Sequence, residues 1–292
     1  MWCWCSSKDA VAPGGLLPGK DLLKAVALSC ISYFELEEFK KNTEYFKADD
    51  IQFMEDKVVD TQLYIVLSKT DRILYVAFRG TTSAVDRKMD RTGALVALDG
   101  ICDPRHPRSQ LKVVEGFKMQ LDAVKDRLLK YIDDHINDFD ELFICGHSLG
   151  AAVATIFAAV YGHHNSSKAT PINKIVKCIT IGCPRVGNKH FARYYNSLIS
   201  PENHWRVYNH RDFIAKIALP IVTHHIPGNS VRIHGSDSNK YTVIQKDTKA
   251  VPIMFVDGLS AHDSDLYMKS VAGFFPELKA DHAELTKYWT DN

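Results

Sequence analysis

The expected fold is decided by a short stretch, LFICGHSLGAAVA at residues 142–154. An apolar strand at 142–145 runs directly into Gly146-His147-Ser148-Leu149-Gly150, and an apolar helix follows. Glycine two residues before and two after a serine lets strand and helix approach closely, which is the setting of a nucleophile elbow. The pattern therefore predicts Ser148 as a nucleophile; the alternative is a surface turn in which glycines happen to flank serine.

The residues around this motif carry no charge. From Leu142 to Ser167 there are 26 residues without Lys, Arg, Asp or Glu, and a run of about 20 apolar residues would span a bilayer. The run divides, however, into a strand ending at Cys145 and a helix over 149–161, neither of membrane length. We expect a central strand buried on both faces, a helix packed on the sheet and no transmembrane segment.

Short apolar strands and helices alternate around this centre. Strands are expected at 61–67, 72–79, 141–145, 176–181, 204–209, 224–233 and 241–245, and helices at 20–39, 117–132, 149–161, 190–199 and 265–275. Alternation of this kind favours an α/β fold, a mostly parallel sheet with helices on both faces. We expect an N-terminal arm at 1–19 and a single domain over 20–292.

Composition excludes several classes of protein. The 292 residues include 36 basic and 35 acidic side chains, giving a net charge of +1, and 46% are hydrophobic. This balance gives no electrostatic footprint for nucleic acid and differs from that of disordered chains. It leaves apolar contact, rather than net charge, as the expected route to a lipid surface.

Cysteine usage and the N-terminus bear on location. Seven cysteines cannot all pair, so reduced, buried thiols are expected. The first residues lack the basic and apolar regions of a secretory signal, which favours a cytoplasmic protein. The pair Cys3 and Cys5, beside two tryptophans, leaves lipidation and attachment to a membrane surface as an alternative. The sequon at Asn165 is interpreted as fortuitous.

Three motifs resemble those of a known family. Residues 77–83 (AFRGTTS), 146–150 (GHSLG) and 181–188 (IGCPRVGN) occur in the order and setting of the fungal-type (class 3) lipases. The resemblance covers about residues 60–275. It implies an α/β-hydrolase fold with an inserted lid.

A serine nucleophile needs a histidine as its base and a carboxylate to orient that histidine. The chain order in α/β-hydrolases is serine, acid, histidine. Asp212 follows the apolar strand 205–208, and His262 precedes the last helix; both match the family's segments. The proline that usually follows the acid is delayed here to position 220. The competing residues are Asp237, Asp247, Asp257, His224, His225 and His234.

The oxyanion of an attacked ester needs two donors. The N–H of Leu149, the residue after the nucleophile, is one, and the resemblance implies Thr81 as the other. A metal site at His262 to Asp265 is the alternative interpretation of that cluster, but no second ligand group has suitable spacing. We expect neither a metal nor a cofactor.

The family's lid would lie between Ser83 and Val113. Here Arg87 stands where secreted members commonly have Trp, whereas Asp90 matches the family's acid. The one apolar run, Ala94 to Leu98 with Leu95, Val96 and Leu98, is the expected cleft-facing side. Nearby arginines, among them Arg105 and Arg108, would then face solvent or lipid phosphates. The alternative is an ordinary surface excursion.

These features predict a serine hydrolase of carboxylic esters, specifically an acylglycerol lipase that forms an acyl-enzyme. Its expected partner is a lipid or ester substrate at a lipid–water interface, not a nucleic acid. A triad does not encode the acyl or alcohol group. Phospholipase A, a feruloyl-type esterase and a catalytically silent interaction module therefore remain alternatives.

Overall fold

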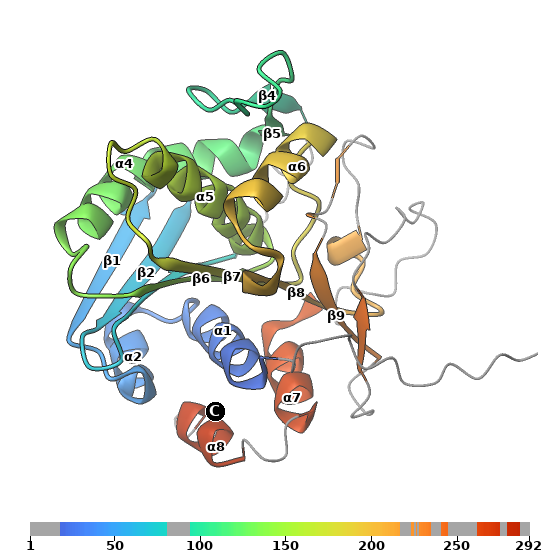
Figure 1. Cartoon of the computed structure of the whole chain (residues 1–292). Helices are drawn as coiled ribbons and strands as arrows, with labels where there is room; N and C mark the ends of the chain where they lie inside the picture. The colour runs from blue at the N-terminus through green and yellow to red at the C-terminus, as the bar shows by residue number, and fades with distance from the viewer. Residues whose placement is uncertain are drawn as a thin grey trace, which may run out of the picture.

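The computed structural model describes residues 18–80, 94–216, 223–224, 226, 228–234, 241–244, 262–274 and 279–286. Its centre is a mixed sheet of eight strands in the order β1-β2-β3-β6-β7-β8-β9-β10. In Figure 1, α4, α5 and α6 cover one face of the sheet, and α1, α2, α7 and α8 lie against the other. The expected α/β class is confirmed.

The strands are β1 (Asp50–Asp56), β2 (Thr61–Ser68), β3 (Ile73–Phe78), β4 (Leu95–Ala97), β5 (Lys112–Val114), β6 (Glu141–His147), β7 (Ile175–Ile181), β8 (His204–Asn209), β9 (Asn229–Ile233) and β10 (Tyr241–Ile244). The α-helices are α1 (Gly19–Ile31), α2 (Leu36–Lys41), α4 (Glu115–Asp134), α5 (Leu149–Ser166), α6 (Lys189–Leu198), α7 (Ser264–Phe274) and α8 (Lys279–Thr286). Within the described residues, short 3₁₀ turns cover Glu44–Phe46, Pro201–Asn203 and Ile214–Lys216.

The parallel part of the sheet runs from β3 through β6, β7 and β8 to β9. The β1-β2-β3 pairs and the β9–β10 pair are antiparallel. Parallel strands bring their carboxyl ends to one edge, where α/β folds bind ligands. β6 leads into Ser148 at that edge, and β8 leads into the loop that carries Asp212.

Each central strand serves two cores. On β6, Leu142 and Ile144 face the core beneath α4 and α5, whereas Phe143 and Cys145 face the core beneath α1. All four side chains are fully buried. A strand between two helical layers has no face for a charged side chain, which accounts for the first part of the uncharged run.

Some expected elements differ from the structure. The helix expected over 20–39 is two helices, because the chain turns at Ser32, whose hydroxyl bonds to the Ser29 carbonyl. Strand β1, at the edge of the sheet, was not expected. Most of its residues are acidic or half-buried, so it lacks the alternation of apolar and polar residues that predicts a strand. α8 and β5 were also missed, and β9 is shorter than expected, with an isolated bridge at His224.

Other expectations concern the membrane, the thiols and the domains. Among the described residues no helix combines the length and the apolarity that spanning a bilayer requires. Cys30, Cys145, Cys178 and Cys183 are free and buried, as expected, whereas Cys102 is free but exposed. Cys3 and Cys5 lie outside the described residues. The division into an arm (1–19) and one domain (20–292) stays a prediction, and α1 begins at Gly19.

Candidate active site

Ser148 stands on a strained turn between β6 and α5. Its backbone has φ 58° and ψ −126°, a conformation that side-chain-bearing residues rarely adopt. The turn is held by a hydrogen bond of 2.9 Å from the Ser148 N–H to the Ile181 carbonyl. Such strain persists only where the surroundings fix it, and it is concentrated at functional sites.

The flanking glycines are required by close approach. A Cβ on Gly146 would lie 2.6 Å from the Gly150 carbonyl group, and one on Gly150 would lie 2.3 Å from the Phe78 carbonyl oxygen. Both contacts are with backbone, which cannot move aside as a side chain would. α5 therefore starts directly against β6 and β3, and this packing presents the serine at the edge of the sheet.

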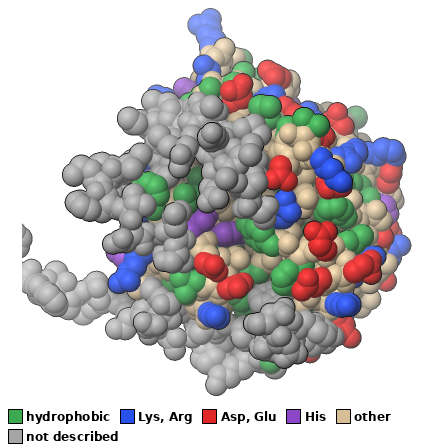
Figure 2. Space-filling view, turned by 180° about the vertical axis from the view of Figure 1, so that it is seen from behind, with side chains coloured by type: hydrophobic (Ala, Val, Ile, Leu, Met, Phe, Trp, Pro, Cys, Tyr) green, Lys and Arg blue, Asp and Glu red, His purple; other side chains and the backbone are tan. Residues whose placement is uncertain are grey.

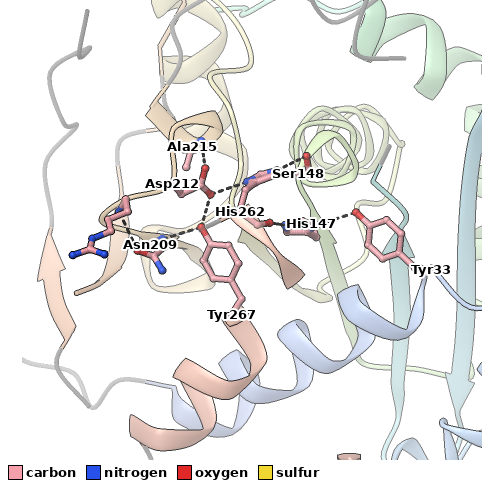
Figure 3. A network of polar contacts seen from close by, with 9 residues as sticks. Tyr33, His147, Ser148, Asn209, Asp212, Ala215, His262 and Tyr267 are labelled. Carbon is pink, nitrogen blue, oxygen red and sulfur yellow. Dashed lines mark hydrogen bonds and ion pairs between the residues drawn. The ribbon is translucent and has the colours of Figure 1, made fainter. Parts of the chain in front are cut away.

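His262 and Asp212 meet Ser148 from two other parts of the chain. His262 Nε2 lies 2.7 Å from Ser148 Oγ, and His262 Nδ1 lies 2.8 Å from Asp212 Oδ2. Figure 3 shows the three side chains in line, with the imidazole in the middle. In this geometry Nδ1–H donates to the carboxylate, and Nε2 accepts from the serine hydroxyl, which is the arrangement of a serine–histidine–acid triad.

Asp212 is fully buried but well supplied with donors. Its Oδ1 accepts the Ala215 N–H at 3.1 Å, and its Oδ2 accepts the Tyr267 hydroxyl at 2.5 Å as well as the His262 ring. Buried carboxylates are tolerated when they are hydrogen-bonded in this way. The loop after β8 therefore holds Asp212 with both oxygens hydrogen-bonded and no exposed surface.

Tyr267, on α7, was not singled out from the sequence. Its oxygen accepts the Asn209 N–H at 2.8 Å while its hydroxyl donates to Asp212. Burial, and then the Asp212 carboxylate, raises the pKa of Tyr267 well above 10, so the hydroxyl stays protonated and donates. The only sequence signal was its place five residues after the histidine.

A second network supports the loop that carries His262. His147 is buried; its Nε2 lies 2.8 Å from the His262 carbonyl oxygen, and its Nδ1 lies 2.9 Å from the Tyr33 hydroxyl. Burial, and then His262, lowers the pKa of His147 well below 6.5, so the ring is neutral. A carbonyl only accepts, so Nε2 carries the proton and Tyr33 donates to Nδ1. Tyr33 was another residue that sequence reasoning missed.

The expected oxyanion donors are only partly described. Leu149 is buried and is the first residue of α5. The first N–H groups of a helix have no acceptor within the helix, so this N–H is available beside Ser148. Thr81 lies outside the described residues, which on that side end at Gly80.

The lid expectation requires a correction. Arg87 and Asp90 lie outside the described residues, but Leu95 and Val96 belong to strand β4, which pairs with β5. Leu98 is buried in the core beneath α4 and α5. The apolar run is therefore not the cleft-facing side of a helix, because three of its residues form strand β4, in which Leu95 and Val96 are half-buried and Ala97 is exposed.

Of the competing residues, the structure describes His224 and His234, and neither contacts the triad. His224 forms an isolated bridge with Gly187, and His234 is exposed and stacks with His210. His225, Asp237, Asp247 and Asp257 lie outside the described residues. Over the described part of the chain, no group of three or more metal-ligating side chains is present, including at Asp263 and Asp265.

Similarity to known proteins assigns the chain to a family. A model of the family described as Lipase (class 3) matches residues 75–221, half of the chain. The chain belongs to the class 3 lipase family. This class 3 lipase is accordingly a carboxylic-ester hydrolase that acts on lipid.

Two curated relatives and one solved structure illustrate the membership. The secreted mono- and diacylglycerol lipase A of Penicillium cyclopium is 26% identical over 266 residues, covering 82% of this chain and 81% of the relative. Phospholipase A1-IIdelta of Arabidopsis thaliana is 35% identical over 114 residues, 38% of this chain and 26% of the relative. The Rhizomucor miehei triacylglyceride lipase has a TM-score of 0.64 at 21% identity, covering 85% and 96% of the two chains, and shares the fold.

These relatives also correct the expected location. The cytoplasmic assignment was wrong: the mono- and diacylglycerol lipases that this class 3 lipase resembles are secreted, which points to an extracellular location. The absence of a recognisable signal in the first residues was too weak an observation to carry that assignment.

Proposed function

We propose that this class 3 lipase hydrolyses acylglycerol esters through an acyl-enzyme on Ser148, with His262 as general base and acid and Asp212 as the orienting carboxylate. The observation that carries the proposal is the continuous contact from Ser148 Oγ through the His262 ring to buried Asp212, at 2.7 and 2.8 Å. An unaided serine hydroxyl is a poor nucleophile, and this contact supplies the missing base.

The reaction follows from these contacts. Ser148 Oγ attacks the ester carbonyl carbon while its proton passes to His262 Nε2. The resulting imidazolium is stabilised by Asp212 and donates the proton to the departing alcohol oxygen, leaving an acyl-serine. Water then attacks the acyl-serine with His262 again as base, and the carboxylic acid and free serine are released.

The negative oxygen formed in each attack requires fixed donors. The Leu149 N–H at the start of α5 is one, and the positive end of the helix adds to it. We assign the second donor to Thr81, which directly follows Gly80, the last described residue after strand β3. Losing one such donor costs about 2.7–4 kcal/mol of transition-state stabilisation.

The similarity of this chain to its curated relatives supports acylglycerols as substrates. The relatives that align over most of both chains are mono- and diacylglycerol lipases. We propose that the lipase acts on such esters at a lipid–water interface. Phospholipid is the second candidate, because the locally most identical relative among those above is a phospholipase A1.

The test combines a reactive probe with a substrate series. A serine-directed phosphonate is expected to label the wild type and not Ser148→Ala, and the variant is expected to lose activity by a factor on the order of 10⁶. p-Nitrophenyl esters of increasing chain length, diacylglycerol and phosphatidylcholine then rank the substrates. Labelling that persists in Ser148→Ala would overturn the assignment of the nucleophile.

A further inference from the structure

A basic hollow lies between β5 and the start of α6, outside the triad. Its volume is about 830 Å³, and the positively charged side chains that line it are Arg108, Lys112 and Lys189, beside the rings of His190 and His224. Among the described residues no Asp or Glu lines it. A concave surface of one charge sign concentrates ligands of the opposite sign.

The floor of this hollow is a fixed backbone ladder. Gly187 bridges Val113 on one side and His224 on the other. The Asn188 N–H donates to the Lys112 carbonyl at 2.8 Å, and the His224 N–H donates to the Gly187 carbonyl at 2.7 Å. Three chain segments are thereby held together, so Lys112 and Lys189 project from a preorganised surface, and Arg108 lies in the turn that precedes β5.

The cations of the hollow are also not neutralised. Within the described part of the chain, no carboxylate lies within 4 Å of the charged ends of Arg108, Lys112 or Lys189, whereas pairs such as Arg72 with Asp140 occur elsewhere. On the face shown in Figure 2, acidic and basic side chains alternate across the described surface. The local excess of positive charge is thus a feature of the hollow and not of the whole protein, whose net charge is +1.

The start of α6 adds to the positive field. Lys189 is the first residue of this ten-residue helix, and Asn188 caps it by accepting the Phe191 N–H at 2.9 Å. A helix N-terminus attracts anions. Burial, and then the charges of Lys189 and Arg193, lowers the pKa of His190, which agrees with a positive surrounding.

The hollow is close to the triad along the chain. Gly182 packs against the His262 ring, where an added Cβ would lie 3.0 Å from Cε1. Asn188 is the sixth residue after Gly182, and six steps of extended chain span at most about 20 Å. A lipid surface that presents an ester to Ser148 is much wider than about 20 Å. The same surface can therefore contact both the triad and the hollow.

We propose that this hollow binds phosphate groups of an anionic lipid surface and so retains the enzyme on the surface where its substrate lies. The inference rests on the proposed ester hydrolysis and goes beyond it by naming the kind of surface. It replaces the expectation that apolar contact alone leads the protein to lipid.

Vesicle binding tests the proposal directly. The full chain carrying Ser148→Ala, which prevents turnover, is sedimented with vesicles of phosphatidylcholine alone or with phosphatidylglycerol added. We expect tighter binding to the anionic vesicles, and a loss of roughly a hundredfold or more on adding Arg108→Glu, Lys112→Glu and Lys189→Glu. The double variant Arg108→Glu, Lys189→Glu alters only exposed side chains and is expected to lose at least tenfold.

A matched control separates the hollow from general charge. Lys41→Glu, Lys57→Glu and Lys269→Glu make the same change in net charge at exposed positions of α2, the β1–β2 turn and α7. This control should keep most of the anionic-vesicle binding; an equal loss in both triple variants would overturn the proposal. Inorganic phosphate should displace the protein from anionic vesicles more strongly than chloride of equal ionic strength, because it presents the same group to the hollow. Phosphate binding without any preference for anionic vesicles would overturn the lipid surface as its source.

Soluble-ester activity distinguishes this inference from the proposed function. With Ser148 intact, the charge variants should hydrolyse p-nitrophenyl butyrate as fast as the wild type, because none of the altered residues touches the triad. A wild type that hydrolyses no ester would refute the proposed function, and the vesicle result would still stand. Ester hydrolysis by a wild type that shows no preference for anionic vesicles would refute only the proposed role of the hollow.

Discussion

At the scale of single residues, Asp212 shows how the triad is kept in position. A carboxylate can orient a histidine only if its own oxygens are fixed. Asp212 has no exposed surface, and donors from Ala215, Tyr267 and His262 occupy its two oxygens. Tyr267 is in turn held by the Asn209 N–H. We therefore interpret Tyr267 as a positioning residue, because it acts on the reaction only through Asp212.

Replacing Tyr267 by Phe removes one donor from this carboxylate. Hydrogen bonds to charged groups contribute about 1.5–3 kcal/mol, so we expect kcat to fall about tenfold or more with KM unchanged. Without the Tyr267 donor, the Asp212 carboxylate attracts the His262 imidazolium more strongly. The acid limb of the rate–pH profile should therefore move to higher pH. Steady-state kinetics from pH 5 to 9 measure both effects.

Tyr64→Phe is the matched control for that change. Tyr64 is equally buried and donates to the Phe34 carbonyl at 2.8 Å, away from the triad. It should reproduce any loss of stability without altering kcat or the pH profile. If Tyr267→Phe behaves in the same way as this control, Tyr267 contributes to stability alone and its positioning role is refuted.

At the scale of elements, the elbow depends on how closely α5 starts against β3. In Gly150→Ala the added methyl would meet the Phe78 carbonyl oxygen at 2.3 Å, so the helix has to move away from the strand. Overpacking of this kind costs about 1–3 kcal/mol. We expect that loss in the free energy of unfolding, measured by urea titration, and a larger loss of kcat, because Ser148 moves with the helix.

Gly162→Ala tests the same substitution at the other end of α5. There the nearest atom is the Leu198 Cβ at 3.0 Å, so a shift of only a few tenths of an ångström is needed, whereas Gly150 faces backbone at 2.3 Å. Alanine also favours a helix over glycine by up to about 1 kcal/mol. Stability and kcat should both stay near those of the wild type. If Gly150→Ala and Gly162→Ala lose equal amounts of unfolding free energy and kcat, the losses come from a general change in helix α5 and not from the elbow at Ser148.

Much of the fold could be predicted from local sequence. The strand at 142–145 and the helix after Ser148 were recognised because both are fully buried and glycines mark the turn between them. Asp212 and His262 were placed by chain order together with the family resemblance. These assignments needed only the sequence next to each residue, and the structure brings the three side chains within hydrogen-bonding distance.

The remaining features depend on contacts that a sequence does not display. The run at 94–98 is apolar at every position, so its period could not distinguish a lid helix from strand β4. Tyr33 was expected inside a helix, but helix α1 ends at Ile31. The Tyr33 hydroxyl instead contacts His147, which is 114 residues away in the sequence. Tyr267 likewise gains its role from a contact with Asp212 across 55 residues.

At the scale of the whole molecule, buried neutral histidines couple folding to pH. His147 and His204 are both buried, and burial lowers their pKa values, that of His204 to about 3. In the unfolded chain both ionise near pH 6.5. Below pH 6.5 the unfolded chain therefore binds more protons than the folded protein, and acid lowers the free energy of unfolding.

The slope of this effect can be measured at His204. Between pH 6 and pH 4.5 each such histidine contributes up to about 1.4 kcal/mol per pH unit to the fall in unfolding free energy. His204→Asn should therefore reduce the slope by about that amount in urea titrations, although the loss of its contact with the Tyr195 hydroxyl lowers stability at every pH. Tyr195→Phe removes the same hydrogen bond but keeps the His204 imidazole, so it should lower stability and leave the slope close to that of the wild type. An unaltered slope in His204→Asn would mean that His204 does not stay neutral in the folded protein at these pH values, and that acid lability arises elsewhere.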